Sequence, residues 1–282
     1  MNPAYLVAML GSVLFGAADL AGGISAKRAP APVITCFSGY AALLVLFLGV
    51  PFVHGTPTGA DLAWGAVAGT CGMLGATLIY HSLALGPVSV ASPVFCVIGL
   101  STPVLAGVFY GERPSPLAWS GVALAAASLP PLAWSGANAT AEERAHLRRT
   151  LMVAIAAGLV VGGFLIAVHR IGAHAGLLPL IVARTVAIAG LTAGLFVMRI
   201  PLVPPPAARG SALAAGALDS SANVCFWLAS QQAPLALVAA LVSLSPATTV
   251  VLGRLLLKEP WTGAQKLGLL MALVAGVLIS LG

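Results

Sequence analysis

Apolar stretches of about 20 residues, each long enough to cross a membrane as an α-helix, follow one another along nearly the whole chain. They lie near residues 3–25, 31–53, 60–84, 87–109, 115–136, 150–169, 176–198, 209–231, 234–256 and 262–281. The stretches show no strict alternation of apolar and polar residues, so helices are expected rather than the strands of a barrel. The sequence therefore predicts an all-α, polytopic membrane protein with ten transmembrane helices.

Composition excludes a water-soluble domain. Of the 282 residues, 60% are hydrophobic and only 7% are charged, whereas soluble domains carry about 25% charged residues. The 13 Lys and Arg residues exceed the 7 Asp and Glu residues. In this setting we attribute the excess to helix ends and not to a nucleic-acid partner. We expect a multi-pass protein of the inner or plasma membrane whose surroundings are the lipid bilayer.

The cysteines predict neither a metal site nor a disulfide framework. Cys36, Cys71, Cys96 and Cys225 all fall inside apolar stretches, without a CxxC pair or a neighbouring histidine. We expect them to act as small apolar residues, and we expect no metal and no cofactor.

The two halves of the chain repeat each other at an offset of 147 residues. The offset aligns Gly69 with Gly216, Tyr80 with Trp227, and the segment YGERPSPLAWSG with LKEPWTGAQKLG. We divide the chain into a first five-helix repeat (1–137), a charged linker (138–149) and a second five-helix repeat (150–282). Because five is odd, the repeats must have opposite orientations in the membrane, which is typical of transporters. Thr140 and Glu143 in the linker predict a capping box.

These features resemble the drug/metabolite transporter superfamily, in particular its EamA-type members with ten helices. The resemblance rests on VFYGERPSP and LLLKEPWTG, on the Gly-rich helix after each, and on YHSLALGPVSVASPV and FWLASQQAPLALVAAL before them. It implies a substrate cavity between the halves, alternating access, and the export of amino acids, drugs or metabolites. Similar proteins often carry a basic residue early in the second helix of each half. Arg184 fits that place, but its counterpart near Phe37 is uncharged.

Asp19 lies deep in the first predicted helix, eight residues before Lys27. An ionisable residue at mid-membrane costs about 2.5–3.5 kcal/mol on insertion scales, which indicates a functional role. Its spacing from the lysine resembles that in small multidrug resistance proteins, where such an acid binds a proton or a cationic drug. The alternative is a carboxylate paired with a neighbouring helix or placed near the water interface.

Asp219 and Arg184 are the other two ionisable residues that the sequence places inside the membrane. Asn223, Phe226, Trp227 and Ser230 share one helical face with Asp219, which is typical of a substrate-lined cavity. The alternative is a polar contact between helices. Arg184 either holds a substrate carboxylate, pairs with Asp219, or extends to the interface.

Tyr80 and His81 end the third predicted helix. Since Tyr80 is the repeat mate of Trp227, the two aromatic side chains are candidates for opposite walls of one cavity. Histidine is the side chain that ordinarily changes charge near neutral pH, which makes His81 a candidate, although a single histidine at an interface is more often structural.

Alternate connections differ sharply in charge. One side carries Lys27, Arg28, Arg144, Arg148, Arg149, Arg199, Arg209, Arg254, Lys258 and Lys266, whereas the other carries Arg113 and Arg170. The positive-inside rule then places both termini outside the cell, whereas the resemblance implies cytoplasmic termini.

We expect a secondary transporter that exports amino acids, other small metabolites or drug-like compounds, with protons as candidate coupling ions and with a monomer sufficient for the pathway. The polar residues within the membrane are scattered and form no catalytic set, so an enzyme is not expected. A passive channel is the alternative, although the intramembrane charges break the repeat symmetry that a pore ring needs. A single intramembrane cation disfavours sugar phosphates and nucleotides as substrates.

Overall fold

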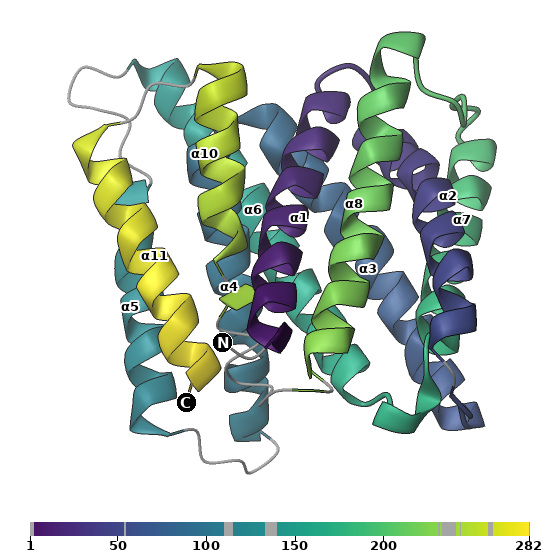
Figure 1. The fold of residues 1–282 in the computed structure, drawn as a ribbon. Helices are drawn as coiled ribbons and strands as arrows, with labels where there is room; N and C mark the ends of the chain where they lie inside the picture. The colour runs from purple at the N-terminus through teal and green to yellow at the C-terminus, as the bar shows by residue number, and fades with distance from the viewer. Residues whose placement is uncertain are drawn as a thin grey trace.

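The computed structural model describes residues 3–53, 55–109, 115–132, 140–230, 232, 241–242, 244–258 and 262–281, and within them it is all-α (Figure 1). The helices are α1 (Pro3–Ala26), α2 (Ala31–Gly49), η1 (Val50–Phe52), α3 (Gly59–Leu85), α4 (Val88–Phe109), α5 (Pro116–Leu132), α6 (Ala141–His169), η2 (Ala173–Ala175), α7 (Leu178–Val197), α8 (Pro206–Ser230), α10 (Ser245–Leu257) and α11 (Gly263–Leu281). Among the described residues, α1, α2, α3, α4, α6 and α7 are each long and apolar enough to cross a membrane.

Helix α6 differs from its prediction, because it begins at Ala141 rather than near residue 150. The predicted capping box is present. Glu143 N donates to Thr140 Oγ1 (3.2 Å), and Thr140 N donates to Glu143 Oε2 (2.7 Å). This cap starts the helix within the charged segment, so those residues extend α6 beyond its apolar part. The predicted ninth span, 234–256, falls partly outside the described residues, and α10 forms its second half.

The inverted repeat is visible in the helix boundaries. Three helices of the second half begin 147 residues after their mates: α7 at 178 against α2 at 31, α8 at 206 against α3 at 59, and α11 at 263 against α5 at 116. The halves interlock, because α1 packs mainly against α8 while its mate α6 packs against both α3 and α4. Helices α5 and α11, which are mates of each other, also pack together.

Glycines allow the two halves to approach at backbone distance. A Cβ atom at Gly216 of α8 would overlap the carbonyl oxygen of Ser38 in α2. Its repeat mate, Gly69 of α3, lies in the same way against the carbonyl oxygen of Ala183 in α7. Small residues provide close packing in membranes, where burial of apolar surface does not drive helices together.

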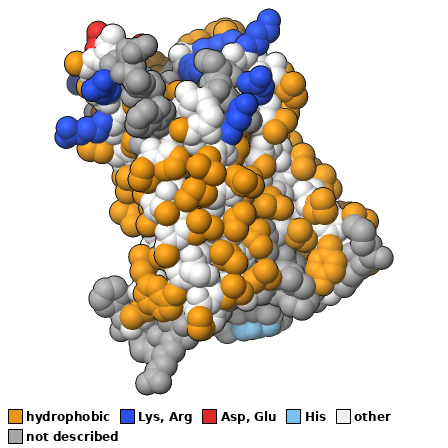
Figure 2. All heavy atoms as spheres, turned by 90° about the vertical axis from the view of Figure 1, so that its left-hand side faces the viewer, with side chains coloured by type: hydrophobic (Ala, Val, Ile, Leu, Met, Phe, Trp, Pro, Cys, Tyr) orange, Lys and Arg blue, Asp and Glu red, His pale blue; other side chains and the backbone are white. Residues whose placement is uncertain are grey.

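The outer surface has an apolar band and one basic end. Figure 2 shows apolar side chains covering the middle of one face, with Lys and Arg side chains gathered above them. The connections α1–α2 and α7–α8 lie at the basic end, where Ser25 Oγ donates to Ser211 Oγ (2.7 Å). Both termini lie toward the opposite end (Figure 1). The alternation of charge read from the sequence is therefore present in the fold.

At the opposite end, Asp61 joins a connection of the first half to one of the second. Its carboxylate accepts hydrogen bonds from Thr58 N (2.7 Å), Thr58 Oγ1 (2.6 Å) and Gly172 N (2.8 Å). His174 Nε2 lies 3.3 Å from Asp61 Oδ2, and Thr56 N donates to the His174 carbonyl oxygen (2.9 Å). With Asp61 only 4% exposed, this carboxylate fastens the α2–α3 connection to the α6–α7 connection.

Replacing Gly216 with alanine is expected to lower the unfolding temperature, because the new methyl group has no room against the Ser38 carbonyl oxygen. Such overpacking costs about 1–3 kcal/mol. Gly210→Ala in the same helix is the matched control, since nothing lies within 4 Å of its Cβ position. Thermal unfolding followed by tryptophan fluorescence measures both variants. Equal effects of the two changes would contradict the close approach of α8 to α2.

Asp61→Ala is expected to lower the unfolding temperature more than Glu143→Ala does. Both residues close a capping box at the N3 position of a helix, α3 and α6 respectively. Only Asp61 is buried and also bonded to the other half of the protein, so its removal leaves the Gly172 N–H without this acceptor. The same unfolding assay compares the two, and a larger effect of Glu143→Ala would show that Asp61 does not fasten the connections.

Candidate functional site

Arg184 and Asp219 form an ion pair between two apolar helices. Arg184 lies on α7 and Asp219 on α8, and an Nη2 hydrogen of Arg184 is donated to Asp219 Oδ2. Their side chains are 26% and 27% exposed. One turn further along α8, Asn223 Nδ2 donates to the Asp219 carbonyl oxygen (2.8 Å) and lies 3.5 Å from Oδ2. Of the three alternatives for Arg184, the structure therefore places it in a pair with Asp219.

Asp219 lies in a stripe of small, buried residues along α8. The buried alanines of α8 are spaced three, four or seven residues apart. Asp219 occupies the same stripe, four residues after Ala215 and three before Ala222. Residues at this spacing lie on one face of a helix. The alanines of the stripe are Ala208, Ala212, Ala215, Ala222 and Ala229, each 0% exposed.

Asp19 lies opposite Asp219 on α1. The two helices run antiparallel, with Ser25 bonded to Ser211 above and Gly11 packed against Cys225 and the Ala222 carbonyl oxygen below. Asp19 falls between these two crossing points, on the stretch of α1 that packs against the part of α8 that carries Asp219. One turn away, Gly16 packs against the backbone of α10, with its Cβ position 2.7 Å from Ser245 O. The cluster thus lies where α1 crosses helices of the second half.

Tyr80 of α3 lies against the same cluster. Its ring covers Gly22, which follows Asp19 on α1 by three residues, and the side chain is only 6% exposed. Tyr80 also packs with Ala212 and Ala215 of α8, in the stretch that precedes Asp219. The structure therefore brings five of the seven sequence-predicted residues into one region: Asp19, Tyr80, Arg184, Asp219 and Asn223.

The remaining two candidates are not placed in the cluster. His81 follows Tyr80 on α3, and among the described residues no hydrogen bond or ion pair joins it to the cluster. The backbone of Trp227 lies in α8, but its side chain lies outside what the structure describes. Glu112 and Glu259, the acidic residues of the two repeated segments, also lie outside the described residues.

Sequence reasoning missed several buried hydroxyl groups in the helices that pack around α1. Ser245 and Thr249 begin α10 beside Gly16, and both are buried. The hydroxyls of Ser92 in α4 and Ser220 in α8 are buried, and within the described part of the chain they have no hydrogen-bond partner. A single serine or threonine in an apolar helix is a weak signal, because its hydroxyl commonly bonds to the carbonyl one turn earlier.

The positive and negative charges of the cluster do not balance. Among the described residues it holds two carboxylates, Asp19 and Asp219, against one guanidinium, Arg184. With all three ionised, the cluster carries one excess negative charge. A proton or a monovalent cation would neutralise it. Within the same residues, no group of three His, Cys, Asp or Glu side chains is arranged to hold a metal ion.

Comparisons with known proteins were made for the whole chain. The profile of the EamA-like transporter family matches residues 2–129 and 148–281. A solved crystal structure, described only as that of a protein, covers 99% of this chain and 98% of its own chain with a TM-score of 0.64 and 17% sequence identity. That likeness shows the fold alone. No curated protein matches the chain significantly.

Removing either partner of the ion pair is expected to destabilise the protein more than removing both. Arg184→Gln or Asp219→Asn leaves one charge without its partner, which costs about 3 kcal/mol, the lower end for fully buried pairs. In the double variant Arg184→Gln/Asp219→Asn, most of this loss should be recovered. A double-mutant cycle of unfolding temperatures in detergent measures the coupling. Additive effects of the two single changes would mean that the pair contributes nothing.

Proposed function

The chain belongs to the EamA-like transporter family and is a membrane transporter, and we propose that it exports small amine-bearing molecules, either amino acids or drug-like cations, in exchange for protons. The observation that carries this proposal is the excess carboxylate, with Asp19 and Asp219 against the single cation Arg184. The inverted repeat supports alternating access, since a site between inverted halves can face either side of the membrane through related conformations.

Asp19 is the proposed exchange site. Asp219 already has a cationic partner in Arg184, whereas Asp19 interacts with Asp219, a charge of its own sign. Like charges at close range favour protonation of one of the two carboxyls. A proton and an ammonium group then compete for Asp19, so that binding of one releases the other. Such mutual exclusion at one carboxyl is sufficient to couple the two flows.

The rest of the cluster suits a small amphiphilic substrate. The ring of Tyr80 offers an aromatic surface that attracts a cation. Asn223 holds the Asp219 carbonyl oxygen and steadies the ion pair that borders the site. A substrate with several phosphate charges fits poorly, because Arg184, the cation of the cluster, is already paired.

The charge pattern supports an orientation. We propose that the basic end faces the cytoplasm and that both termini face the outside, in line with the positive-inside rule. Protease accessibility of a short tag at either terminus, in intact cells, tests this orientation independently of transport.

Transport is tested in liposomes that contain the purified protein, with labelled amino acids, an amphiphilic cation and a sugar phosphate on one side. We expect saturable transport of an amine-bearing compound that a pH gradient accelerates. One pH unit corresponds to about tenfold accumulation when one proton exchanges for one monovalent cation, because each unit supplies about 1.4 kcal/mol. With a monovalent cation this exchange moves no net charge, so an imposed membrane potential should leave it unchanged. With a zwitterionic amino acid it moves one charge, so the potential should change the rate.

Asp19→Asn is expected to abolish the response to the pH gradient, while Glu143→Gln, which alters an exposed carboxylate in the first turn of α6, should behave as the wild type. An unchanged gradient response in Asp19→Asn would remove Asp19 from the mechanism. Transport that is saturable but indifferent to pH in the wild type would leave a facilitator, and the absence of saturable transport in folded protein would contradict the proposal as a whole.

A further inference from the structure

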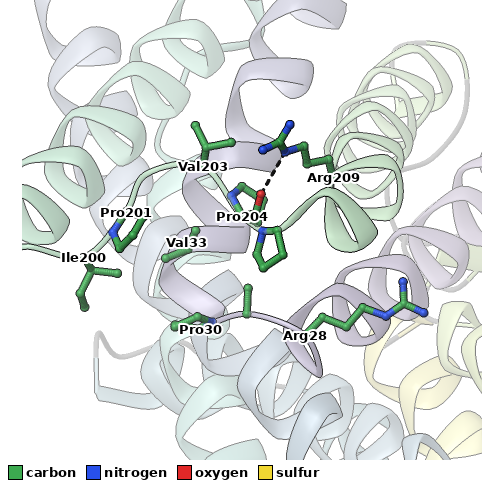
Figure 3. A pocket seen from close by; sticks show the side chains of 10 residues that line it. Arg28, Pro30, Val33, Ile200, Pro201, Val203, Pro204 and Arg209 are labelled. Atoms are coloured by element: carbon green, nitrogen blue, oxygen red, sulfur yellow. Dashed lines mark hydrogen bonds between the residues drawn. The ribbon is translucent and has the colours of Figure 1, made fainter.

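A hollow of about 380 Å³ lies at the basic end of the protein, apart from the charged cluster (Figure 3). The α1–α2 connection of the first half and the α7–α8 connection of the second half form its walls. Its lining consists of Arg28, Ala29, Pro30, Val33, Ile200, Pro201, Val203, Pro204, Pro205 and Arg209. The transport proposal does not use any of these residues.

The lining is cationic and contains no acidic residue. Arg209 Nε donates to the Pro204 carbonyl oxygen (3.0 Å), and Arg28 donates to the Ala207 carbonyl oxygen. Each guanidinium has five N–H donors, so these bonds fix the side chains and leave donors for an anion. The helices α2 and α8 also begin at the hollow, after Pro30 and Pro205, and helix N-termini add partial positive charge.

Apolar surface continues from the hollow onto the outside of α7. Phe196, Val197 and Met198 at the end of α7 are 78%, 80% and 68% exposed, and Val203 in the wall is 51% exposed. In a membrane protein such residues lie against lipid acyl chains. An occupant of the hollow would therefore meet cationic donors at one end and the acyl-chain region at the other.

We propose that this hollow binds the phosphate-bearing headgroup of an anionic phospholipid, whose acyl chains lie along the exposed end of α7. Basic pockets between helices are suited to such headgroups, and each basic residue near the surface strengthens the attraction. The apolar wall of Val33, Ile200 and Val203 favours an amphiphile over free phosphate, because a small hydrated anion gains nothing from apolar contacts.

The test uses the full-length protein in phosphatidylcholine micelles titrated with phosphatidylglycerol, with the unfolding temperature as readout. We expect a saturable rise for the wild type. In Arg28→Gln/Arg209→Gln the half-saturating fraction of phosphatidylglycerol should increase at least about tenfold. The matched control is Arg148→Gln/Arg149→Gln, which removes two exposed arginines of α6 outside the hollow and should saturate as the wild type does.

Three outcomes would overturn the proposal. An equal shift in the control pair would mean diffuse attraction to the basic end, and a saturable rise with inorganic phosphate alone would mean a small-anion site. An unchanged titration in the arginine double variant would mean that the hollow does not bind the lipid. If that double variant does not fold, Val203→Glu replaces it. This change adds a negative charge to the exposed wall while both arginines keep their bonds, and it should weaken the lipid response equally.

Discussion

The ion pair between Arg184 and Asp219 determines how the helices around it can pack. Each charge alone would cost about 2.5–3.5 kcal/mol at mid-membrane, so α7 and α8 must bring the two side chains together. Asp219 sits in the alanine stripe of α8, and that stripe faces α1 closely enough for Asp19 to interact with it. Alanine and glycine at this crossing let the helices approach closely. Close packing and buried charge therefore depend on each other at this crossing.

The sequence predicted the helices well because a membrane leaves the backbone few choices. Apolar length set most boundaries to within a few residues, and the repeat offset of 147 reappears in the starts of α7, α8 and α11. Helix α6 was predicted to start too late because its first turns are charged and solvated, although the Thr140 capping box was recognised. In that case the local hydrogen bonds of the cap, and not apolar length, set the boundary.

The candidate site was predicted residue by residue but not as a cluster. Asp19, Arg184 and Asp219 stood out because each is an isolated charge in an apolar helix. The placement of Asp19 near Asp219 depends on α1 packing against α8 of the other half, and sequence periodicity does not specify which helices exchange partners. Ser245 and Thr249 of α10 were missed for the same reason, since only the packing of Gly16 brings them to the site.

The scaffold is symmetric whereas its charges are not, and this difference has a physical consequence. The offset that relates the halves places Gly72 where Asp219 would be and Ile166 where Asp19 would be. At the mated crossing of α3 with α6, Gly72 lies beside the ring of Phe164, with its Cβ position 3.5 Å from the nearest ring carbon. Water that enters the α1–α8 crossing solvates three charges, whereas at the α3–α6 crossing it would only replace apolar contacts, at about 25 cal/mol per Å² exposed. Hydration is therefore favoured at one crossing and opposed at its mate, although the helices at the two crossings are related by the same repeat.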